Sequence, residues 1–197
     1  MDIVLATANE NKLSEMKALL PARFNLVSQR SLGVNEANET GLSFVENAII
    51  KARHATSASG LPAIADDSGL EVDYLSGAPG IYSSRYAGAD ATDAENNEKL
   101  LKDMQTASAP HRRARFRCVI VMMEHDRDPM PTIACGTWEG EILTSPRGAN
   151  GFGYDPLFYV SSLTRTVAEL DRETKNLLSH RGQAIRELAG MLSQHDK

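Results

Sequence analysis

The chain has little of what marks several classes of protein. Its 197 residues include two cysteines, and Cys118 and Cys135 do not have the spacing of metal ligands, so we expect both to be reduced core residues. The longest apolar run, Cys118 to Met123, is too short to cross a bilayer. The run from Ile3 to Ala6 is too short for the apolar part of a signal peptide. These absences favour a cytoplasmic protein without membrane partners.

A basic excess is also missing. The formal net charge is −5, whereas binding to nucleic-acid or membrane phosphates calls for a positive surface. Arg113, Arg115 and Arg117 alternate along one predicted strand and could form a nucleic-acid stripe, but in an acidic chain a solvated or interfacial face is favoured. We therefore expect no nucleic-acid partner, although a local basic cluster could still bind one small anion.

The hydrophobic pattern alternates between strand-like and helix-like segments. With 42% hydrophobic and 24% charged residues, the chain can build the core of one large domain, in one piece or with two lobes. Short apolar runs predict strands, and apolar residues three and four apart predict helices, which together indicate an α/β protein. The predicted strands are residues 3–7, 24–28, 113–123, 131–143 and 157–160, and the predicted helices are residues 11–20, 43–59, 93–104 and, with a break near Ser179, 166–194.

Two adjacent carboxylates, Asp66 and Asp67, follow the apolar run Ala63 to Ala65 and precede Ser68 and Gly69. This pattern predicts a buried strand that ends in a tight turn, with a second strand leaving it. Successive strand residues point to opposite faces, so Asp66 and Asp67 cannot share a face. An acidic pair at a strand end suits a hard cation and an activated water, but an ordinary polar turn explains the same residues.

Residues 7–12, Thr-Ala-Asn-Glu-Asn-Lys, connect the first predicted strand to the first predicted helix. The free backbone N–H groups and the positive end of the helix dipole make such a turn a ready anion site, and Lys12 adds a charge one turn in. Simple capping of the helix by Asn9 explains the segment equally well. Glu39, farther along, is either a solvated loop acid or a carboxylate that reaches the same cleft as Asp67.

A glycine-rich loop, residues 147–156, carries two aromatic side chains and an acid just before an apolar strand. Glycines allow a backbone to approach a ligand closely, and Phe152 offers a flat face on which a base could stack, so we favour a ligand loop over a packed flexible one. Near the C-terminus, Ser179 is expected to cap a new helix and to place His180 and Arg181 in its exposed first turn. The tyrosines and arginine of residues 81–86 suit a subunit interface.

Six short motifs follow one another along the chain, and together they resemble the inosine triphosphate pyrophosphatase family, most of all its bacterial Ham1-like and RdgB-like members. Each motif alone is weak, but six in this order are specific, and the resemblance covers essentially the whole length. The motifs are Thr7-Ala-Asn-Glu-Asn-Lys12, Glu39-Thr-Gly-Leu-Ser-Phe-Val-Glu-Asn-Ala48, Ala65-Asp-Asp-Ser-Gly69, Gly77-Ala-Pro-Gly-Ile-Tyr-Ser-Ser-Arg-Tyr86, Gly151-Phe-Gly-Tyr-Asp-Pro156 and Ser179-His-Arg-Gly182.

The resemblance implies an α/β fold with a long mixed β-sheet flanked by helices, in a single domain over residues 1–197 with two lobes and a central cleft, and it implies a homodimer. It also implies Mg²⁺-dependent hydrolysis of ITP, dITP and XTP to the monophosphate and pyrophosphate, which cleanses the nucleotide pool. Two other functions fit the pattern less well. One is a nucleotide sensor of the same fold without turnover, and the other is a Maf-like pyrophosphatase that acts on modified pyrimidine nucleotides.

Roles for individual residues follow from the same resemblance. Asp67 is expected to be the general base and a Mg²⁺ ligand, with Glu39 as the second metal carboxylate. His180 and Arg181 are expected to donate hydrogen bonds to the C6 oxygen of hypoxanthine or xanthine and to oppose the amino group of adenine. The expected substrate-binding residues are Thr7, Ala8, Asn9, Glu10, Asn11, Lys12, Ser68, Phe152, Gly153, Tyr154, Asp155, Lys175, His180 and Arg181.

Overall fold

A seven-stranded mixed sheet runs through the part of the chain that the structure, a computed structural model, describes: residues 2–7, 9–21 and 23–194. The strand order is β2-β1-β3-β4-β5-β6-β7. β1 is parallel to β2 and β3, whereas β6 is antiparallel to β5 and β7. The strands are β1 (Asp2–Leu5), β2 (Asn25–Ser28), β3 (Ala63–Val72), β4 (Arg113–Met123), β5 (Thr132–Ile142), β6 (Phe158–Val160) and β7 (Arg165–Thr166).

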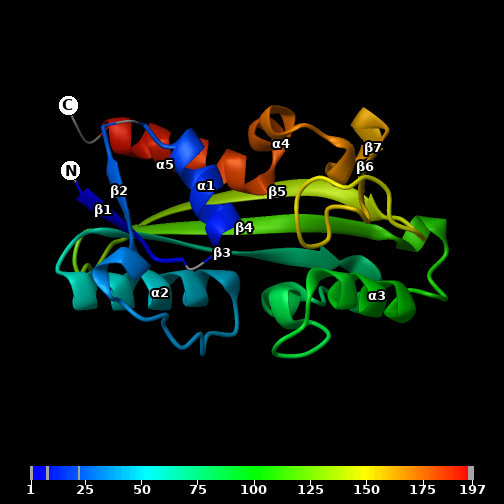
Figure 1. The fold of residues 1–197 in the computed structure, drawn as a ribbon, viewed down its shortest axis with the longest axis horizontal. Helices are drawn as coiled ribbons and strands as arrows, with labels where there is room; N and C mark the ends of the chain where they lie inside the picture. The colour runs from blue at the N-terminus through cyan, green and yellow to red at the C-terminus, as the bar shows by residue number, and fades with distance from the viewer. Residues whose placement is uncertain (1, 8, 22, 195–197) are drawn as a thin grey trace. The chain divides into compact units, whose positions relative to one another are not determined.

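Helices flank these strands (Figure 1), so the predicted α/β fold with a long mixed sheet is confirmed. No helix of the described residues is both long and apolar enough to span a membrane. The helices are α1 (Glu10–Leu19), α2 (Phe44–Ser59), α3 (Asp93–Asp103), α4 (Arg172–Leu178) and α5 (His180–Gln194).

The chain divides into two compact units. The first unit comprises Met1–Asp67, Cys118–Gly136 and His180–Lys197, and the second comprises Ser68–Arg117 and Thr137–Ser179. The candidate site residues fall in both units. The cleft expected between two lobes stays a prediction.

In the first unit, helices cover both faces of the strands. Ile3 and Leu5 of β1 pack with α1 and α5, whereas Val4 packs with the alanine-lined face of α2. This alternation follows from the two-residue period of a strand. It places α1 and α5 together on one side of the strands and α2 on the other (Figure 1).

The second unit has its own hydrophobic core, formed by α3 and by residues of β3 to β6. The rings of Phe116 and Phe158 lie 4.4 Å apart between centroids, and Trp138 is 7% exposed in the same core. Leu100 and Met104 contribute the apolar side of α3. α3 begins with a capping box between Thr92 and Glu95, which satisfies backbone groups at the helix start.

Two local predictions are wrong. Ser68 and Gly69 do not form a turn, because β3 continues from Ala63 to Val72. Nearly every residue of this strand is buried, and packing of the two faces overrides the turn preference of Ser and Gly. The predicted helix over residues 166–194 begins only at Arg172, because Asp171 caps α4, and the preceding residues form β7 and a short 3₁₀ helix.

The cysteine prediction is half right. Cys118 of β4 is buried, whereas Cys135 of β5 is exposed, and both are free thiols. The absence of metal-ligand spacing does not say which face of a strand a cysteine occupies, and alternate residues of a strand face opposite sides. Ala134 is buried, so Cys135 points away from the core.

We expect Leu100→Ala to lower the free energy of unfolding by about 2–5 kcal/mol, because truncating a buried leucine leaves a cavity. Leu177→Ala in α4 is the matched control, since Leu177 is 62% exposed and a surface substitution changes stability by about 0.5 kcal/mol or less. Urea unfolding followed by circular dichroism measures both. Equal losses in the two variants would contradict the assignment of Leu100 to the core.

Candidate active site

The adjacent carboxylates of β3 lie on opposite faces of the strand, as the two-residue period predicts. Asp66 meets Lys12 of α1 and Arg181 of α5, whereas Asp67 meets Lys51 of α2. Both carboxylates are buried, with 1% and 7% of their surface exposed. The first unit therefore holds two separate ion-pair clusters, one on each side of the same strand.

The Asp66 cluster is deeply buried and fully charged. Lys12 Nζ lies 2.9 Å from Asp66 Oδ2, and Arg181 Nε lies 3.4 Å from the same oxygen. Arg181 Nη1 also donates to Glu15. Burial by itself raises the pKa of Asp66, but the positive charges of Lys12, Arg181 and Lys51 outweigh it and hold the pKa well below its usual range. Near neutral pH, Asp66 is thus held as an anion between Lys12 and Arg181.

The expected exposed first turn of α5 is wrong. α5 does begin at His180, after the extended cap residue Ser179, but His180 is 7% and Arg181 is 2% exposed. The guanidinium of Arg181 is occupied by Glu15 and Asp66. Arg181 therefore balances the charge of Asp66, a contact with a residue 115 positions away that helix periodicity could not reveal.

The Asp67 cluster is built around one ammonium group. Lys51 Nζ lies 2.9 Å from Asp67 Oδ1 and 2.9 Å from Glu39 Oε1. Burial opposes the charge on Lys51, but the carboxylates of Asp67, Asp66 and Glu39 outweigh it and raise the pKa of Lys51. Glu39 is thereby brought to Asp67, which is one of the two alternatives that the sequence left open.

Asp67 differs from Asp66 in its proton affinity. Burial raises the pKa of Asp67 above its ordinary value, and the attraction of Lys51 only partly offsets this. Its Oδ2 is buried and has no hydrogen-bond partner among the described residues. Two neighbouring carboxylates whose pKa values are pushed apart are a pattern of acid–base sites, and Asp67 is the one that can take up a proton.

Lys51 is a site residue that sequence reasoning missed. It borders the buried alanine stripe of α2, which contains Ala48, Ala52 and Ala55, and in sequence it resembles any solvated lysine. Its only signal was its place one residue before Ala52, at the margin of the buried face. The contacts to Glu39 and Asp67 join residues 12 and 16 positions away, which a local pattern does not show.

At the start of α1, the capping interpretation is confirmed. Asn9 Oδ1 accepts hydrogen bonds from the backbone N–H groups of Asn11 and Lys12, at 3.0 and 3.1 Å. Thr7 Oγ1 in turn accepts one from Asn9 N, at 3.1 Å. Whether this turn also binds phosphate stays a prediction. Ala8 lies outside the described residues, and the side chain of Glu10 lies outside the described part as well.

In the second unit, the glycine-rich loop is organised by Asp155. Its Oδ2 accepts from the backbone N–H of Phe152 at 3.0 Å and pairs with Lys175 Nζ at 2.6 Å. Lys175 Nζ also lies 4.2 Å from the centroid of the Phe152 ring. Gly151 has a φ of +79°, and a Cβ there would meet Asp155 Oδ2 at 2.0 Å, so glycine is required. The loop thus presents Phe152 beside a buried cation–carboxylate pair.

Two side chains of α3 bind the backbone of Gly153, the next residue of this loop. Asp93 Oδ2 accepts from Gly153 N at 2.6 Å, and Asn97 Nδ2 donates to Gly153 O at 2.8 Å. Tyr154 is buried, and its hydroxyl donates to Ser83 O at 2.8 Å. Asp93 and Asn97 were not predicted, because their polar side chains at the start of α3 look like ordinary surface residues. Ser68, the other predicted residue of this unit, is half-buried on β3.

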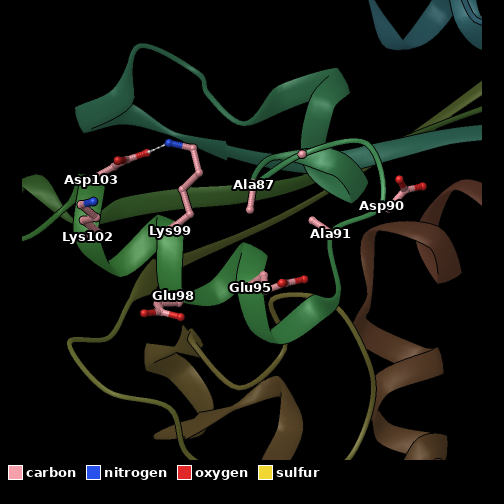
Figure 2. A pocket seen from close by; sticks show the side chains of 9 residues that line it. Ala87, Asp90, Ala91, Glu95, Glu98, Lys99, Lys102 and Asp103 are labelled. Carbon is pink, nitrogen blue, oxygen red and sulfur yellow. Dashed lines mark hydrogen bonds and ion pairs between the residues drawn. The ribbon is translucent and has the colours of Figure 1, made fainter.

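A polar cavity of about 570 Å³ also lies in the second unit, between α3 and the segment before it (Figure 2). Acidic side chains outnumber lysines in its lining, and the two lysines are Lys99 and Lys102. Lys99 pairs with Asp103 at 2.9 Å. None of the predicted site residues that the structure describes lines this cavity. An acidic lining repels a polyanion, so the cavity is not a candidate triphosphate site.

Comparison with known proteins identifies the family. The Ham1 family model matches residues 3–191. The chain belongs to the Ham1 family. Among curated relatives of this Ham1-family chain, the dITP/XTP pyrophosphatase of Photobacterium profundum is 56% identical over 191 residues, which cover 96% of this chain and 97% of that protein. The dITP/XTP pyrophosphatase of Coxiella burnetii is 53% identical over 195 residues, covering 98% of each.

Solved structures of Ham1 proteins agree with this assignment. The Ham1 protein from Coxiella burnetii superimposes with a TM-score of 0.93 at 53% identity, covering 98% of this chain and 99% of that one. The Staphylococcus aureus Ham1 protein superimposes with a TM-score of 0.88 at 42% identity, covering 99% and 100%. The fold of this Ham1-family chain is therefore that of its relatives.

The carboxylates of the Asp67 cluster fit a divalent cation. In the described part of the chain, no group of three or more His, Cys, Asp or Glu side chains could hold a metal. Mg²⁺, however, is commonly bound by one or two carboxylates together with substrate phosphates. Glu39 and Asp67 already share one positive charge, on Lys51, and Asp67 Oδ2 is a buried oxygen without a partner among the described residues. Two hard oxygen donors thus converge where a cation is already favoured.

We expect Asp66→Asn to lower the free energy of unfolding by about 3–5 kcal/mol at pH 7, because it leaves buried positive charges without their partner. The pKa of Asp66 is lower in the folded than in the unfolded chain, so its stabilising contribution is present above about pH 4 and is lost as the pH falls through the folded value. The difference between wild type and variant should therefore shrink below about pH 4.

Urea unfolding at a series of pH values measures this dependence. The control is Asp90→Asn, which removes an exposed carboxylate and should change stability by about 0.5 kcal/mol or less at every pH. A stability difference for Asp66→Asn that stayed constant down to pH 3 would show that the charge of Asp66 is not what stabilises the fold.

Proposed function

We propose that this chain hydrolyses non-standard purine nucleoside triphosphates, namely ITP, dITP and XTP, to the monophosphate and pyrophosphate. The observation that carries the proposal is Asp67, a buried carboxylate of raised pKa beside Lys51 and Glu39. It stands in a chain 53–59% identical to proteins named dITP/XTP pyrophosphatase. The removal of such nucleotides cleanses the nucleotide pool.

Asp67 is proposed as the general base. Its raised pKa comes from burial, so it accepts a proton from an attacking water more readily than a solvated aspartate does. Its Oδ1 is held by Lys51, which leaves Oδ2 as the oxygen that takes the proton. The neighbouring Asp66 cannot serve, because Lys12 and Arg181 hold its pKa low.

Charge neutralisation is the second requirement, since attack at a triphosphate adds negative charge to oxygens that are already anionic. Glu39 and Asp67 would hold Mg²⁺. When bound there, this cation would offset phosphate charge and lower the pKa of water. Lys51, and Lys12 at the start of α1, supply fixed positive charges of the chain itself. The positive end of the α1 helix dipole would add attraction for the phosphates.

The base is proposed to stack on Phe152. Asp155 holds the backbone of Phe152, and Lys175 lies over its ring, so the ring is fixed before a ligand arrives, and stacking on an aromatic ring contributes about 1–3 kcal/mol. His180 is the proposed donor to the C6 oxygen. Arg181 is already occupied by Glu15 and Asp66, so its proposed role is to hold Asp66 rather than to offer donors to the base.

The remaining partner predictions are kept as proposals. Tyr82 is 54% exposed and Arg85 lies 5.2 Å from its ring centroid, which supports a homodimer interface over this segment. Arg115 pairs with Asp73 and Glu139 of the same unit. Arg117 pairs with Glu71, so two of the three arginines are balanced within the chain, which supports the proposal that the protein does not bind nucleic acid. We keep the cytoplasm as the proposed location.

A substrate panel tests the function. The protein is incubated with Mg²⁺ and, separately, ITP, dITP, XTP, GTP, ATP and pyrimidine triphosphates, and pyrophosphate is measured apart from phosphate. We expect pyrophosphate from ITP, dITP and XTP, with kcat/KM at least about tenfold above that for ATP, because one mismatched buried donor costs about 1–3 kcal/mol. Preference for modified pyrimidines would favour a Maf-like activity, and binding without turnover would favour a sensor.

We expect Asp67→Asn to lower kcat by more than about a hundredfold, the scale of a lost general base, while the affinity for dITP is retained. The substitution keeps the size of the side chain and removes its ability to accept a proton. Stopped-flow turnover and calorimetric titration with dITP measure the two quantities. Unchanged turnover in a variant that still binds dITP would refute the role of Asp67.

A further inference from the structure

Residues 34–43, the segment that carries Glu39, form neither a helix nor a strand. It lies between β2 and α2 and is drawn alongside α2 (Figure 1). A strand or helix fixes its side chains through backbone hydrogen bonds, but an irregular segment depends on contacts made by its neighbours. The position of the Glu39 carboxylate therefore depends on what holds this segment against α2.

One stripe of α2 touches the segment at three points. His54 Nε2 lies 2.9 Å from Asn35 O, Lys51 Nζ lies 2.9 Å from Glu39 Oε1, and Asn47 Oδ1 accepts from Gly41 N at 2.9 Å. Residues 47, 51 and 54 are spaced by four and three, so they lie on one face of the helix. The segment thus runs along α2 in the opposite direction, and the contacts of His54 and Asn47 lie on either side of Glu39 in the segment.

Asn47 is an unusual choice for its position. It is 0% exposed, while the other buried residues on this helix are mostly alanines. Its Nδ2 has no hydrogen-bond partner among the described residues, and a buried amide with an unmet donor costs free energy. An alanine would avoid that cost. The hydrogen bond that Asn47 Oδ1 accepts from Gly41 N is the contact that an alanine could not make.

Gly41 is fitted to Asn47 from the other side. A Cβ at Gly41 would meet Glu46 Cβ at 2.6 Å and Asn47 Oδ1 at 2.7 Å, so the backbone approaches α2 more closely than any other residue allows. The next N–H of the segment, that of Leu42, is bound by Glu46 at 2.9 Å. Glu46 is exposed whereas Asn47 is buried. Water can replace the exposed Glu46 carboxylate as the acceptor at little cost in free energy. The buried contact with Asn47 is therefore the one that fixes the segment.

We propose that Asn47 is a positioning residue for the divalent cation: it holds the backbone at Gly41 so that the Glu39 carboxylate is presented beside Asp67. The inference rests on the proposed function, because it concerns the same site. Asn47 touches neither substrate nor cation in this role and acts only through the segment that carries Glu39. Residues that orient metal ligands typically change metal affinity by about 10–100-fold when they are removed.

The test is the affinity for Mn²⁺ in the absence of nucleotide, measured by electron paramagnetic resonance of the free ion with the full chain. We expect Asn47→Ala to weaken Mn²⁺ binding by about tenfold or more. In activity assays the Mg²⁺ concentration for half-maximal turnover should rise by a similar factor, while KM for dITP at saturating Mg²⁺ stays within about twofold, as expected when only the presentation of a metal ligand is lost.

Asn96→Ala is the matched control. Asn96 is 2% exposed, lies on α3 of the second unit and accepts from the loop N–H of Ala87 at 2.8 Å, as Asn47 accepts from Gly41, and its Nδ2 also donates to Ser84 O at 3.1 Å. It should lower stability by a comparable amount and leave Mn²⁺ affinity unchanged. If both variants lose Mn²⁺ affinity equally, the effect is general destabilisation and the proposal is overturned.

Gly41→Ala disturbs the same contact by adding a Cβ to the segment. It is the alternative variant if Asn47→Ala does not fold. It should weaken Mn²⁺ binding as well. The double variant should lose no more Mn²⁺ affinity than the weaker-binding single variant, because both substitutions act through one contact. Unchanged Mn²⁺ affinity in either single variant, or no saturable Mn²⁺ binding by the wild type, overturns the inference. If the Mn²⁺ affinities change as expected but the substrate panel gives no pyrophosphate, the proposed function alone is refuted.

Discussion

The two-residue period of β3 is the constraint on which the first unit depends. It sends Asp66 toward α1 and α5 and Asp67 toward α2, although the two residues are adjacent. The backbone separates them into different environments, so the same side-chain type serves two purposes. Asp66 is held as an anion by Lys12 and Arg181, and Asp67, which pairs with Lys51 alone, has a raised pKa because burial outweighs that one attraction.

The surrounding structure supports this separation. β1 and β3 are parallel neighbours, and the helices on each face bring cations from distant parts of the sequence. Removing one buried partner of such an ion pair costs more than the pair contributes in isolation. In the second unit the same principle organises the glycine-rich loop, where Lys175 and Asp155 form a buried pair that fixes Phe152.

Much of the fold was predictable because it follows from local rules. The apolar pattern gave β4, α2 and α3 within a residue of their observed ends, and capping of α1 by Asn9 was one of the two interpretations that the sequence left open. The turn predicted at Ser68 was wrong, because the turn preference of Ser and Gly is weak against burial of the whole strand. Within the candidate site, the face of each aspartate was predictable from strand geometry, whereas the roles of Lys51 and Asn47 were not. Their contacts depend on how a segment without regular structure lies along α2, and no period in the sequence encodes that.

The ammonium group of Lys51 has a consequence for how the protein tolerates changes in its surroundings. Glu39 and Asp67 have a counterion that belongs to the chain, so their mutual repulsion is relieved without help from solution. A chelator would then deprive the proposed reaction of its magnesium while the folded protein kept its own charge balance. If the proposed magnesium binds there, folding would not depend on it, because Lys51 already balances the charge of the two carboxylates.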